Sequence, residues 1–301
     1  METSLSQQVV VITGAGSGIG RALALRLGAA GARVVVSGRR KEQLDQVADE
    51  ITSRGGQALV VICDVTSRVD CHTMIATIKA TYGDVDILIN NAGRADQGLV
   101  SLLDDAALDE MMALNVKGPL YLIQAVLPAM RRRNSGHILN VITHAAFHGF
   151  GLTPGYAAAK SALKSITQNL RYELCDTDIQ VTAVYPGLVD TGFAAAMAPP
   201  GTSPTDFMAW MRHFRAGQRA SEEFKRIEVP QRPDQVAAII EHALREPGQL
   251  EVFTQAVHHE SAVRMLQDPR WWHQESTRFY QAFLVPLRDM MQRFVEITRT
   301  R

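Results

Sequence analysis

The chain has 301 residues, of which 46% are hydrophobic and 21% are charged, as expected of a globular protein with a substantial core. Basic and acidic residues balance at 31 each, so charge gives no reason to expect a nucleic acid or an anionic membrane as a partner. Three scattered cysteines, Cys63, Cys71 and Cys175, argue against a disulfide framework or a metal site and favour a reducing cytoplasm. The polar start METSLSQQ and the absence of an apolar run near ~20 residues predict neither a signal peptide nor a membrane span.

Short apolar runs alternate with segments of helical periodicity along most of the chain. The runs lack polar alternation, which is typical of strands covered on both faces of a parallel sheet. Helical segments such as 21–31 and 120–133 lie between them. This alternation predicts a doubly wound α/β fold in a single domain. The strand candidates are residues 9–13, 33–37, 58–62, 86–90, 137–142 and 180–185, with a last one at 250–255 after a helix at 233–247.

A glycine-rich turn joins the first strand candidate to the first helix, in VVVITGAGSGIGRALAL. Gly14, Gly18 and Gly20 let the backbone turn tightly and approach a pyrophosphate at the positive end of the helix. A plain tight turn is the alternative, because loops are also glycine-rich for conformational reasons. The strand–turn–helix context favours a dinucleotide loop.

Tyr156 and Lys160 stand four residues apart, which places both side chains on one face of a helix. A free phenol has a pKa near ~10 and seldom releases its proton at neutral pH. A neighbouring ammonium group lowers that pKa and makes proton exchange with a substrate efficient. The hydroxyl of Thr143 ends an apolar run ahead of this pair.

Five motifs in a fixed order make the sequence resemble the short-chain dehydrogenase/reductase family over roughly residues 8–255. They are TGxxxGxG at the glycine loop, NNAG at 90–93, Asn115 within LNVKG, YxxxK at Tyr156 and Lys160, and PGLVDT at 186–191. The resemblance implies a Rossmann-type sheet and an oxidoreductase in which Tyr156 is the general acid/base. It further implies that Lys160 tunes the tyrosine and binds ribose hydroxyls, while Asn115 holds a water on the proton path.

The resemblance also implies which residues form the site. The catalytic set is Asn115, Thr143, Tyr156 and Lys160. The cofactor-binding set is Gly14, Ser17, Gly18, Ile19, Gly20, Ser37, Arg39, Arg40, Asp64, Val65, Asn91, Ala92, Gly93, Tyr156, Lys160, Pro186, Gly187, Val189 and Thr191, and no metal ligand is expected. Thr191 is also a candidate for the N-cap of a helix, a role compatible with cofactor binding.

Thr143 departs from the family, which usually has serine there. Threonine keeps the donor and acceptor that orient a substrate oxygen, but its methyl group restricts the side-chain torsion and crowds the pocket. We therefore expect retained function with an altered substrate fit. The alternative is that Thr143 is an ordinary strand-end residue and that the hydroxyl role is vacant.

The end of the second strand candidate, VVVSGRR, bears on the cofactor. Family members that use NAD usually carry Asp at the position of Gly38, whereas Arg39 can grip the 2′-phosphate of NADP. Ser37 could add a hydroxyl contact. We therefore predict NADP as the cofactor. The alternative is that Arg39 and Arg40 are solvated surface charges. Ser17 counts against NADP, because many NADP-dependent members have a basic residue at that position.

Two segments fall outside the alternation. We expect residues 1–256 to form the catalytic domain, with a Met- and aromatic-rich substrate loop at 193–229 that suits a lipophilic substrate. Residues 257–301 are predicted to form a helical extension whose apolar stripe, Phe279 to Ile297, packs on the core or on a second subunit. The alternative is that this stripe attaches to a membrane, which the interspersed acidic residues disfavour.

The family resemblance implies a homodimer or homotetramer. His144 and His148 are expected to line the pocket rather than to bind a metal.

The sequence as a whole predicts a cytoplasmic NADP(H)-dependent oxidoreductase that interconverts a carbonyl and an alcohol on an apolar or bulky small molecule. A catalytically silent NADP-binding sensor or scaffold is the alternative. Such a protein is expected to lose the tyrosine or the lysine, and this chain keeps both.

Overall fold

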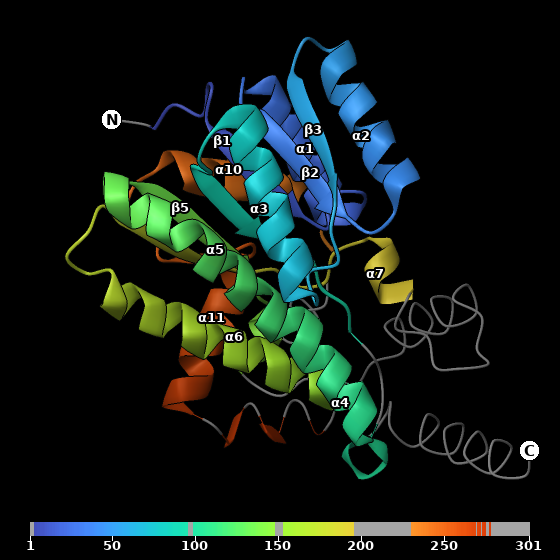
Figure 1. Ribbon diagram of the computed structural model, residues 1–301. Helices are drawn as coiled ribbons and strands as arrows, with labels where there is room; N and C mark the ends of the chain where they lie inside the picture. Colours follow the sequence, from blue (N-terminus) through green and yellow to red (C-terminus); the bar gives the residue numbers. More distant parts are fainter. Residues whose placement is uncertain are drawn as a thin grey trace, which may run out of the picture.

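The computed structural model describes residues 3–95, 99–147, 153–195, 230–268, 270–271, 273–274 and 277. Within them, seven parallel strands form one sheet in the order β3-β2-β1-β4-β5-β6-β7, and helices cover both faces (Figure 1). This confirms the predicted single-domain, doubly wound fold. The strands are β1 (Val9–Thr13), β2 (Arg33–Gly38), β3 (Gln57–Ile62), β4 (Ile87–Asn90), β5 (Gly136–Val141), β6 (Ile179–Tyr185) and β7 (Glu251–Phe253).

Helices separate the strands, as each right-handed crossover between parallel strands requires. The α-helices are α1 (Gly18–Ala29), α2 (Lys41–Ser53), α3 (Arg68–Tyr82), α4 (Asp105–Met112), α5 (Gly118–Arg133), α6 (Pro154–Glu173), α7 (Gly192–Ala195), α10 (Pro233–Arg245) and α11 (Ala256–Gln267). Short turns of other helix types are η1 (Val100–Leu102), η2 (Ala113–Lys117) and η3 (His144–Ala146). Most of the predicted substrate loop, His148 and the stripe from Phe279 to Ile297 lie outside the described residues.

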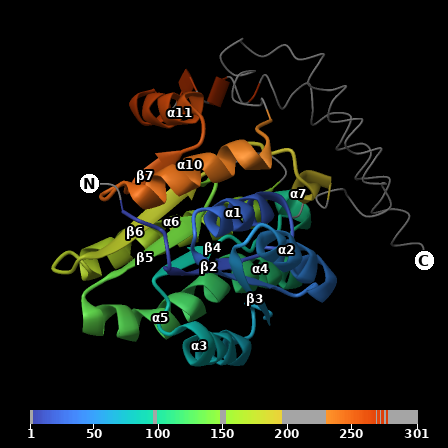
Figure 2. The same ribbon diagram turned by 90° about the horizontal axis from the view of Figure 1, so that it is seen from above.

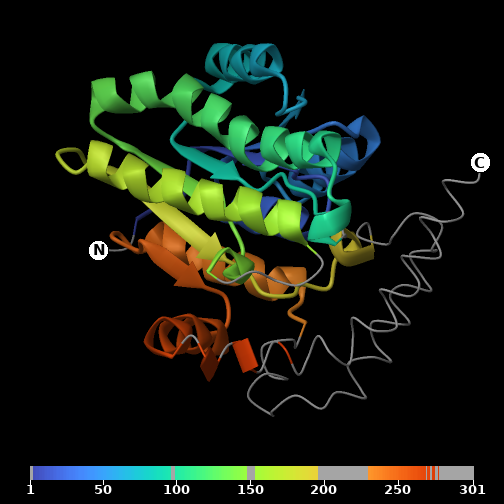
Figure 3. The ribbon, with the colours of Figure 1, turned by 90° about the horizontal axis from the view of Figure 1, so that it is seen from below.

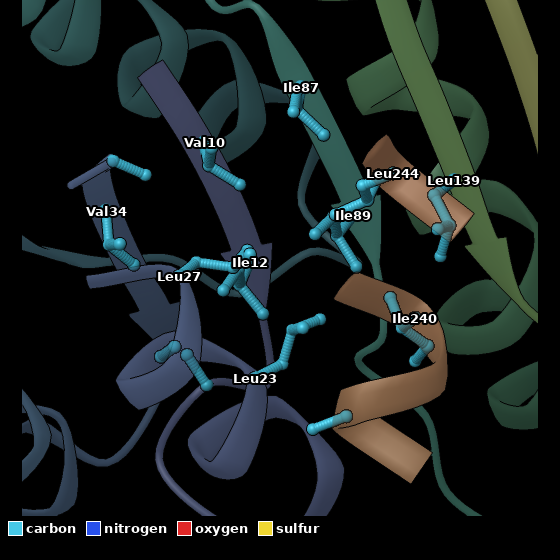
Figure 4. Close-up of a cluster of buried hydrophobic side chains, with 14 of the residues drawn as sticks. Val10, Ile12, Leu23, Leu27, Val34, Ile87, Ile89, Leu139, Ile240 and Leu244 are labelled. Atoms are coloured by element: carbon cyan, nitrogen blue, oxygen red, sulfur yellow. The ribbon is translucent and has the colours of Figure 1, made fainter. Parts of the chain in front are cut away.

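Two apolar cores lie on opposite faces of the sheet, which explains why the strands show no polar alternation. Figure 2 shows α1 and α10 on one face and α3 and α5 on the other. Val10 and Ile12 of β1 pack toward Leu23 of α1 and Ile240 of α10 (Figure 4). Side chains at the alternate positions, including Val9, join the second core under α3 and α5.

A chain of buried polar side chains ties α6 to the centre of the sheet. Asn90 Nδ2 on β4 donates to Asn140 Oδ1 on β5 at 2.8 Å. Asn140 Nδ2 in turn donates to Thr167 Oγ1 on α6, also at 2.8 Å. Buried hydrogen bonds of this kind permit few alternative geometries, because an unsatisfied member is costly. The link holds α6, which runs beside α5 in Figure 3, against the strand ends.

The described helices include none that is both long enough and apolar enough to cross a membrane.

Candidate active site

A pocket of about 700 Å³ opens at the carboxyl ends of the strands, the edge at which ligands bind in such sheets. Its walls come from the segments that follow β1 to β6. Gly20, Ser37 and Asn115 are outside its lining. The expected site residues in the lining are Gly14, Ser17, Gly18, Ile19, Arg39, Arg40, Asp64, Val65, Asn91, Ala92, Gly93, Thr143, Tyr156, Lys160, Pro186, Gly187, Val189 and Thr191.

The glycine loop forms one end of the pocket. Gly14 and Gly18 have φ angles of +66° and +56°, which residues with side chains rarely adopt. α1 begins at Gly18, so the positive end of its dipole borders the pocket. A wall of this kind suits a pyrophosphate. Gly20 is closely packed, because a Cβ there would lie 2.5 Å from the Gly14 carbonyl oxygen.

The segment after β4 is bound to the end of β1. Thr13 Oγ1 accepts hydrogen bonds from the backbone N–H groups of Asn91 and Ala92, at 3.0 and 2.9 Å. The Asn91 amide donates to the Thr13 carbonyl oxygen at 2.8 Å. These bonds hold the NNAG segment beside the glycine loop, so the two motifs form one continuous wall.

Basic side chains border the pocket at the end of β2. Arg39 Nη1 lies 3.9 Å from Asp64 Oδ2, and Arg40 Nη2 donates to Ser17 Oγ at 3.3 Å. Burial pushes the pKa of Asp64 upward, but hydrogen bonds from Thr66 and the charge of Arg39 outweigh it and hold that pKa below its ordinary value. Ser37 is fully buried. Arg39 and Arg40 thus line the pocket, whereas Ser37 does not.

Thr143, Tyr156 and Lys160 meet in the pocket although they come from two elements. Thr143 follows β5, while Tyr156 and Lys160 lie one turn apart on α6. Thr143 Oγ1 accepts a hydrogen bond from the Ala145 N–H at 3.3 Å. Burial raises the pKa of Tyr156 above its ordinary value, and the Thr143 hydrogen bond opposes this only in part.

Lys160 is buried, and its Nζ donates to the Val141 carbonyl oxygen at 2.8 Å. Its Nζ lies 5.9 Å from the centroid of the Tyr156 ring. Burial lowers the pKa of Lys160 to about 8. The sequence predicted that the charge of Lys160 would govern the pKa of Tyr156, whereas burial has the largest effect on the pKa of both groups.

Asn115 lies behind the pocket wall. It belongs to η2, a π-type turn between α4 and α5, and its Nδ2 donates to the carbonyl oxygens of Arg94 and Met111 at 3.0 and 3.1 Å. Its Oδ1 is buried without a hydrogen-bond partner among the described residues. A Cβ on Gly93 would lie 2.9 Å from that oxygen and 3.4 Å from Lys160 Nζ, so Asn115 and the lysine flank the same glycine.

Several lining residues were not anticipated from the sequence. Phe193, by contrast, is the first residue of the predicted substrate loop, and its ring centroid lies 5.8 Å from that of Tyr156. Phe193 N–H donates to Thr191 Oγ1 at 3.2 Å, so the threonine caps the short helix α7 and lines the pocket at once. His144 lines the pocket, as expected. The unanticipated lining residues include Gly16, Gln43, Leu44, Cys63, Arg94, Leu114 and Leu188.

A group of three or more His, Cys, Asp or Glu side chains that could hold a metal ion does not occur in the part of the chain that the structure describes. The parallel sheet, the glycine turn at its carboxyl edge and the pocket beside them define an α/β protein of the Rossmann-like class.

Comparison with known proteins narrows this class to a family. The model of the short chain dehydrogenase family matches residues 8–200. An uncharacterized oxidoreductase of Staphylococcus aureus strain MW2 is 41% identical over 210 residues, which cover 68% of this chain and 87% of that protein. The chain therefore belongs to the short-chain dehydrogenase family and is an oxidoreductase by that membership.

Solved structures agree on the fold. A variant of actinorhodin polyketide ketoreductase determined with NADPH is 31% identical, with a TM-score of 0.71 over 84% of this chain and 97% of that chain. A metagenomic short-chain oxidoreductase in complex with NADP is 29% identical, with a TM-score of 0.66 over 83% and 97%. A short-chain dehydrogenase/reductase from Burkholderia phymatum with NAD superposes with a TM-score of 0.76 over 90% and 96%, at 22% identity, and supports the fold alone.

Proposed function

We propose that the protein is an NADP(H)-dependent oxidoreductase that interconverts a carbonyl and an alcohol, with Tyr156 as the general acid/base. The observation that carries the proposal is that one pocket joins a glycine loop at a helix N-terminus to the side chains of Thr143, Tyr156 and Lys160. The similar ketoreductase and metagenomic oxidoreductase were determined with NADPH and NADP, which supports a nicotinamide cofactor here.

The residues of the pocket divide the chemistry of carbonyl reduction between them. A bound NADPH supplies hydride to the carbonyl carbon. The Thr143 hydroxyl orients the carbonyl oxygen, and the Tyr156 hydroxyl gives its proton to that oxygen as negative charge develops there. Because burial raises the pKa of Tyr156, the phenol keeps its proton at neutral pH and is ready to donate. Lys160, when charged, stabilises the phenolate that remains until solvent returns the proton.

The titration of Lys160 predicts how the reduction depends on pH. Its pKa of about 8 lies below the ordinary value of a lysine, so the ammonium is present below pH 8 and is lost above it. We expect kcat/KM for NADPH, which reports groups of the free enzyme, to be flat from about pH 6 to 7.5 and to fall above about pH 8. In Lys160→Arg the fall should move to higher pH, because guanidinium stays charged. The same fall in both proteins would contradict the assignment.

The arginines after β2 support the choice of NADP. Arg39 and Arg40 both line the pocket, and an arginine–phosphate pair forms strong charge-assisted hydrogen bonds. We expect Arg39→Ala combined with Arg40→Ala to raise the Kd for NADPH by roughly 10- to 100-fold and to change the Kd for NADH little.

A substitution at Gly38 tests whether the cofactor preference can be shifted from NADPH to NADH. A Cβ at this position would lie 3.7 Å from its nearest neighbour, Leu44 Cδ2, so the site has room for a side chain. Gly38→Asp places a carboxylate where it repels a 2′-phosphate and accepts ribose hydroxyls, and we expect it to favour NADH over NADPH. Equal affinity of the unmodified protein for both cofactors, measured by nicotinamide fluorescence, would contradict the proposed preference.

Apolar side chains around Tyr156 support a lipophilic or bulky substrate. Phe193 lies beside Tyr156 in the pocket, and Leu114 and Leu188 also line it. Such a lining favours substrates that bury apolar surface over sugars. Turnover of a panel of aromatic, cyclic aliphatic and polyhydroxylated carbonyl compounds with NADPH tests the proposal. Sugars reduced faster than the apolar members would overturn the substrate class.

A silent dinucleotide-binding sensor is the second candidate, favoured by Thr143 in place of serine. Tight NADPH binding with no turnover of any panel member would support it.

We further propose a cytoplasmic protein, in line with the free thiols of its three cysteines. A homodimer or homotetramer is proposed from family membership, and its size is measurable by light scattering.

A further inference from the structure

Two histidine rings from distant parts of the chain stack beside the pocket. His144 lies in η3, directly after Thr143, and His258 lies in α11. Their ring centroids are 4.3 Å apart and their planes differ by 6°. His258 is 1% exposed, so this contact belongs to the interior of the protein.

The His258 ring also fills the space above Gly187. A Cβ on Gly187 would lie 1.8 Å from His258 Cε1 and 2.6 Å from Nε2. No side chain can therefore occupy position 187 while the ring stays in place. Gly187 lines the pocket, so the far side of this part of the wall is formed by the imidazole.

His144 is bound to the same part of the wall. Its backbone N–H donates to the Pro186 carbonyl oxygen at 3.2 Å, and its Nδ1 lies 3.3 Å from that oxygen. The segment before α11 is held by Gln231, whose Nε2 donates to the Thr254 carbonyl oxygen at 2.8 Å. The Gln231 backbone donates to the Leu188 carbonyl oxygen at 2.9 Å. α11 is thus coupled to the 186–188 wall through a side-chain stack and through a backbone connection.

We propose that His258 is a positioning residue of the active site. Its ring supports Gly187 directly and Thr143 through His144, and so holds the two walls between which the nicotinamide end of the cofactor and the carbonyl group would lie. The proposal rests on the proposed function. α11 lies beyond the residues 8–200 matched by the family model, so this support comes from the part of the chain outside that match.

A comparison of two ligands tests the positioning role without requiring turnover. NADPH bound as proposed would reach the wall at Gly187, whereas 2′,5′-ADP carries the adenosine and phosphate groups alone. We expect His258→Ala to weaken NADPH binding by about tenfold and to leave 2′,5′-ADP binding within about twofold, because a misplaced wall costs affinity and rate only at the nicotinamide end. If the protein proves to prefer NADH, the two ligands to compare are NADH and AMP.

Matched variants separate positioning from general stability. Val257→Ala removes a buried side chain from the same helix, and it should lower Tm without changing the ratio of the two affinities. His258→Phe keeps a flat ring and should restore NADPH affinity and kcat. If His258→Ala does not fold, His144→Ala breaks the same stack from the other side and carries the same expectation. Equal affinity ratios in the His258, His144 and Val257 variants and in the unmodified protein would overturn the inference.

Substitution at Gly187 gives a second, independent measurement. Gly187→Ala should lower Tm and NADPH affinity strongly in the unmodified protein, because its methyl group meets the ring. The same substitution should do less harm in the His258→Ala background, where the ring is absent. Additive effects would show that the ring does not bear on Gly187 and would overturn the proposal.

These measurements distinguish the inference from the proposed reaction. Selective loss of NADPH affinity in His258→Ala, with no turnover by the unmodified protein, would support the inference and refute the reaction. Turnover by the unmodified protein, together with an unchanged affinity ratio and unchanged turnover in His258→Ala, would support the reaction and refute the inference. Failure of the unmodified protein to bind NADPH or NADH would refute both.

Discussion

Tyr156→Phe is expected to lower kcat for carbonyl reduction by roughly 10²- to 10⁴-fold, the range typical of a lost general acid. The substitution removes one oxygen and keeps the ring, which contacts Phe193 at 5.8 Å between centroids. The Kd for NADPH should therefore change little. Stopped-flow single-turnover kinetics and nicotinamide fluorescence measure the two quantities separately.

A second buried tyrosine offers the matched control for this prediction. Tyr185 is fully buried at the end of β6, where its ring packs against Phe147 and Phe253. Tyr185→Phe removes the same atom from a similarly enclosed ring outside the pocket lining, and kcat should stay within about threefold. Comparable losses in both variants would indicate a structural effect and would contradict the proton-donor role of Tyr156.

Thr143→Val is expected to lower kcat by about 10²- to 10³-fold. In other enzymes, the loss of one hydrogen-bond donor to a developing oxyanion has an effect of this size. Valine keeps the shape of threonine and removes the hydroxyl that accepts from Ala145 N–H. The pKa of Tyr156 should rise further, because the hydrogen bond that opposes the effect of burial is lost.

Thr143→Ser separates the hydroxyl of this residue from its methyl group. Serine keeps the donor and acceptor, so kcat should stay within about threefold, while the space left by the methyl group should admit bulkier carbonyl compounds. The measurement is the ratio of kcat/KM values across a size series of ketones. A fully active Thr143→Val variant would show that the hydroxyl role is vacant and would favour the silent candidate.

The fold could be predicted from the sequence because its strongest signals are local. β1 has the predicted bounds, and the other strands differ from prediction by a few residues at their ends. Continuous apolar runs are typical of buried parallel strands, and the positive φ angles at positions 14 and 18 favour glycine there. Parallel strands bring their carboxyl ends to one edge, so the motifs that follow β1, β4, β5 and β6 meet in one pocket.

Burial and contacts between distant segments were decided only by the tertiary structure. Ser37, Gly20 and Asn115 belong to recognisable motifs, yet packing places them behind the pocket wall, since residue type alone does not determine the direction of a side chain. The raised pKa of Tyr156 and the lowered pKa of Lys160 arise from burial, which only the folded chain produces.

The residues that could carry a proton transfer were thus determined by the sequence, through residue types at short fixed spacings. Their environment was determined by the fold. The stack of His144 on His258 joins positions 114 residues apart, and no local pattern predicts it, because such a contact exists only once α11 has packed against the loop after β6.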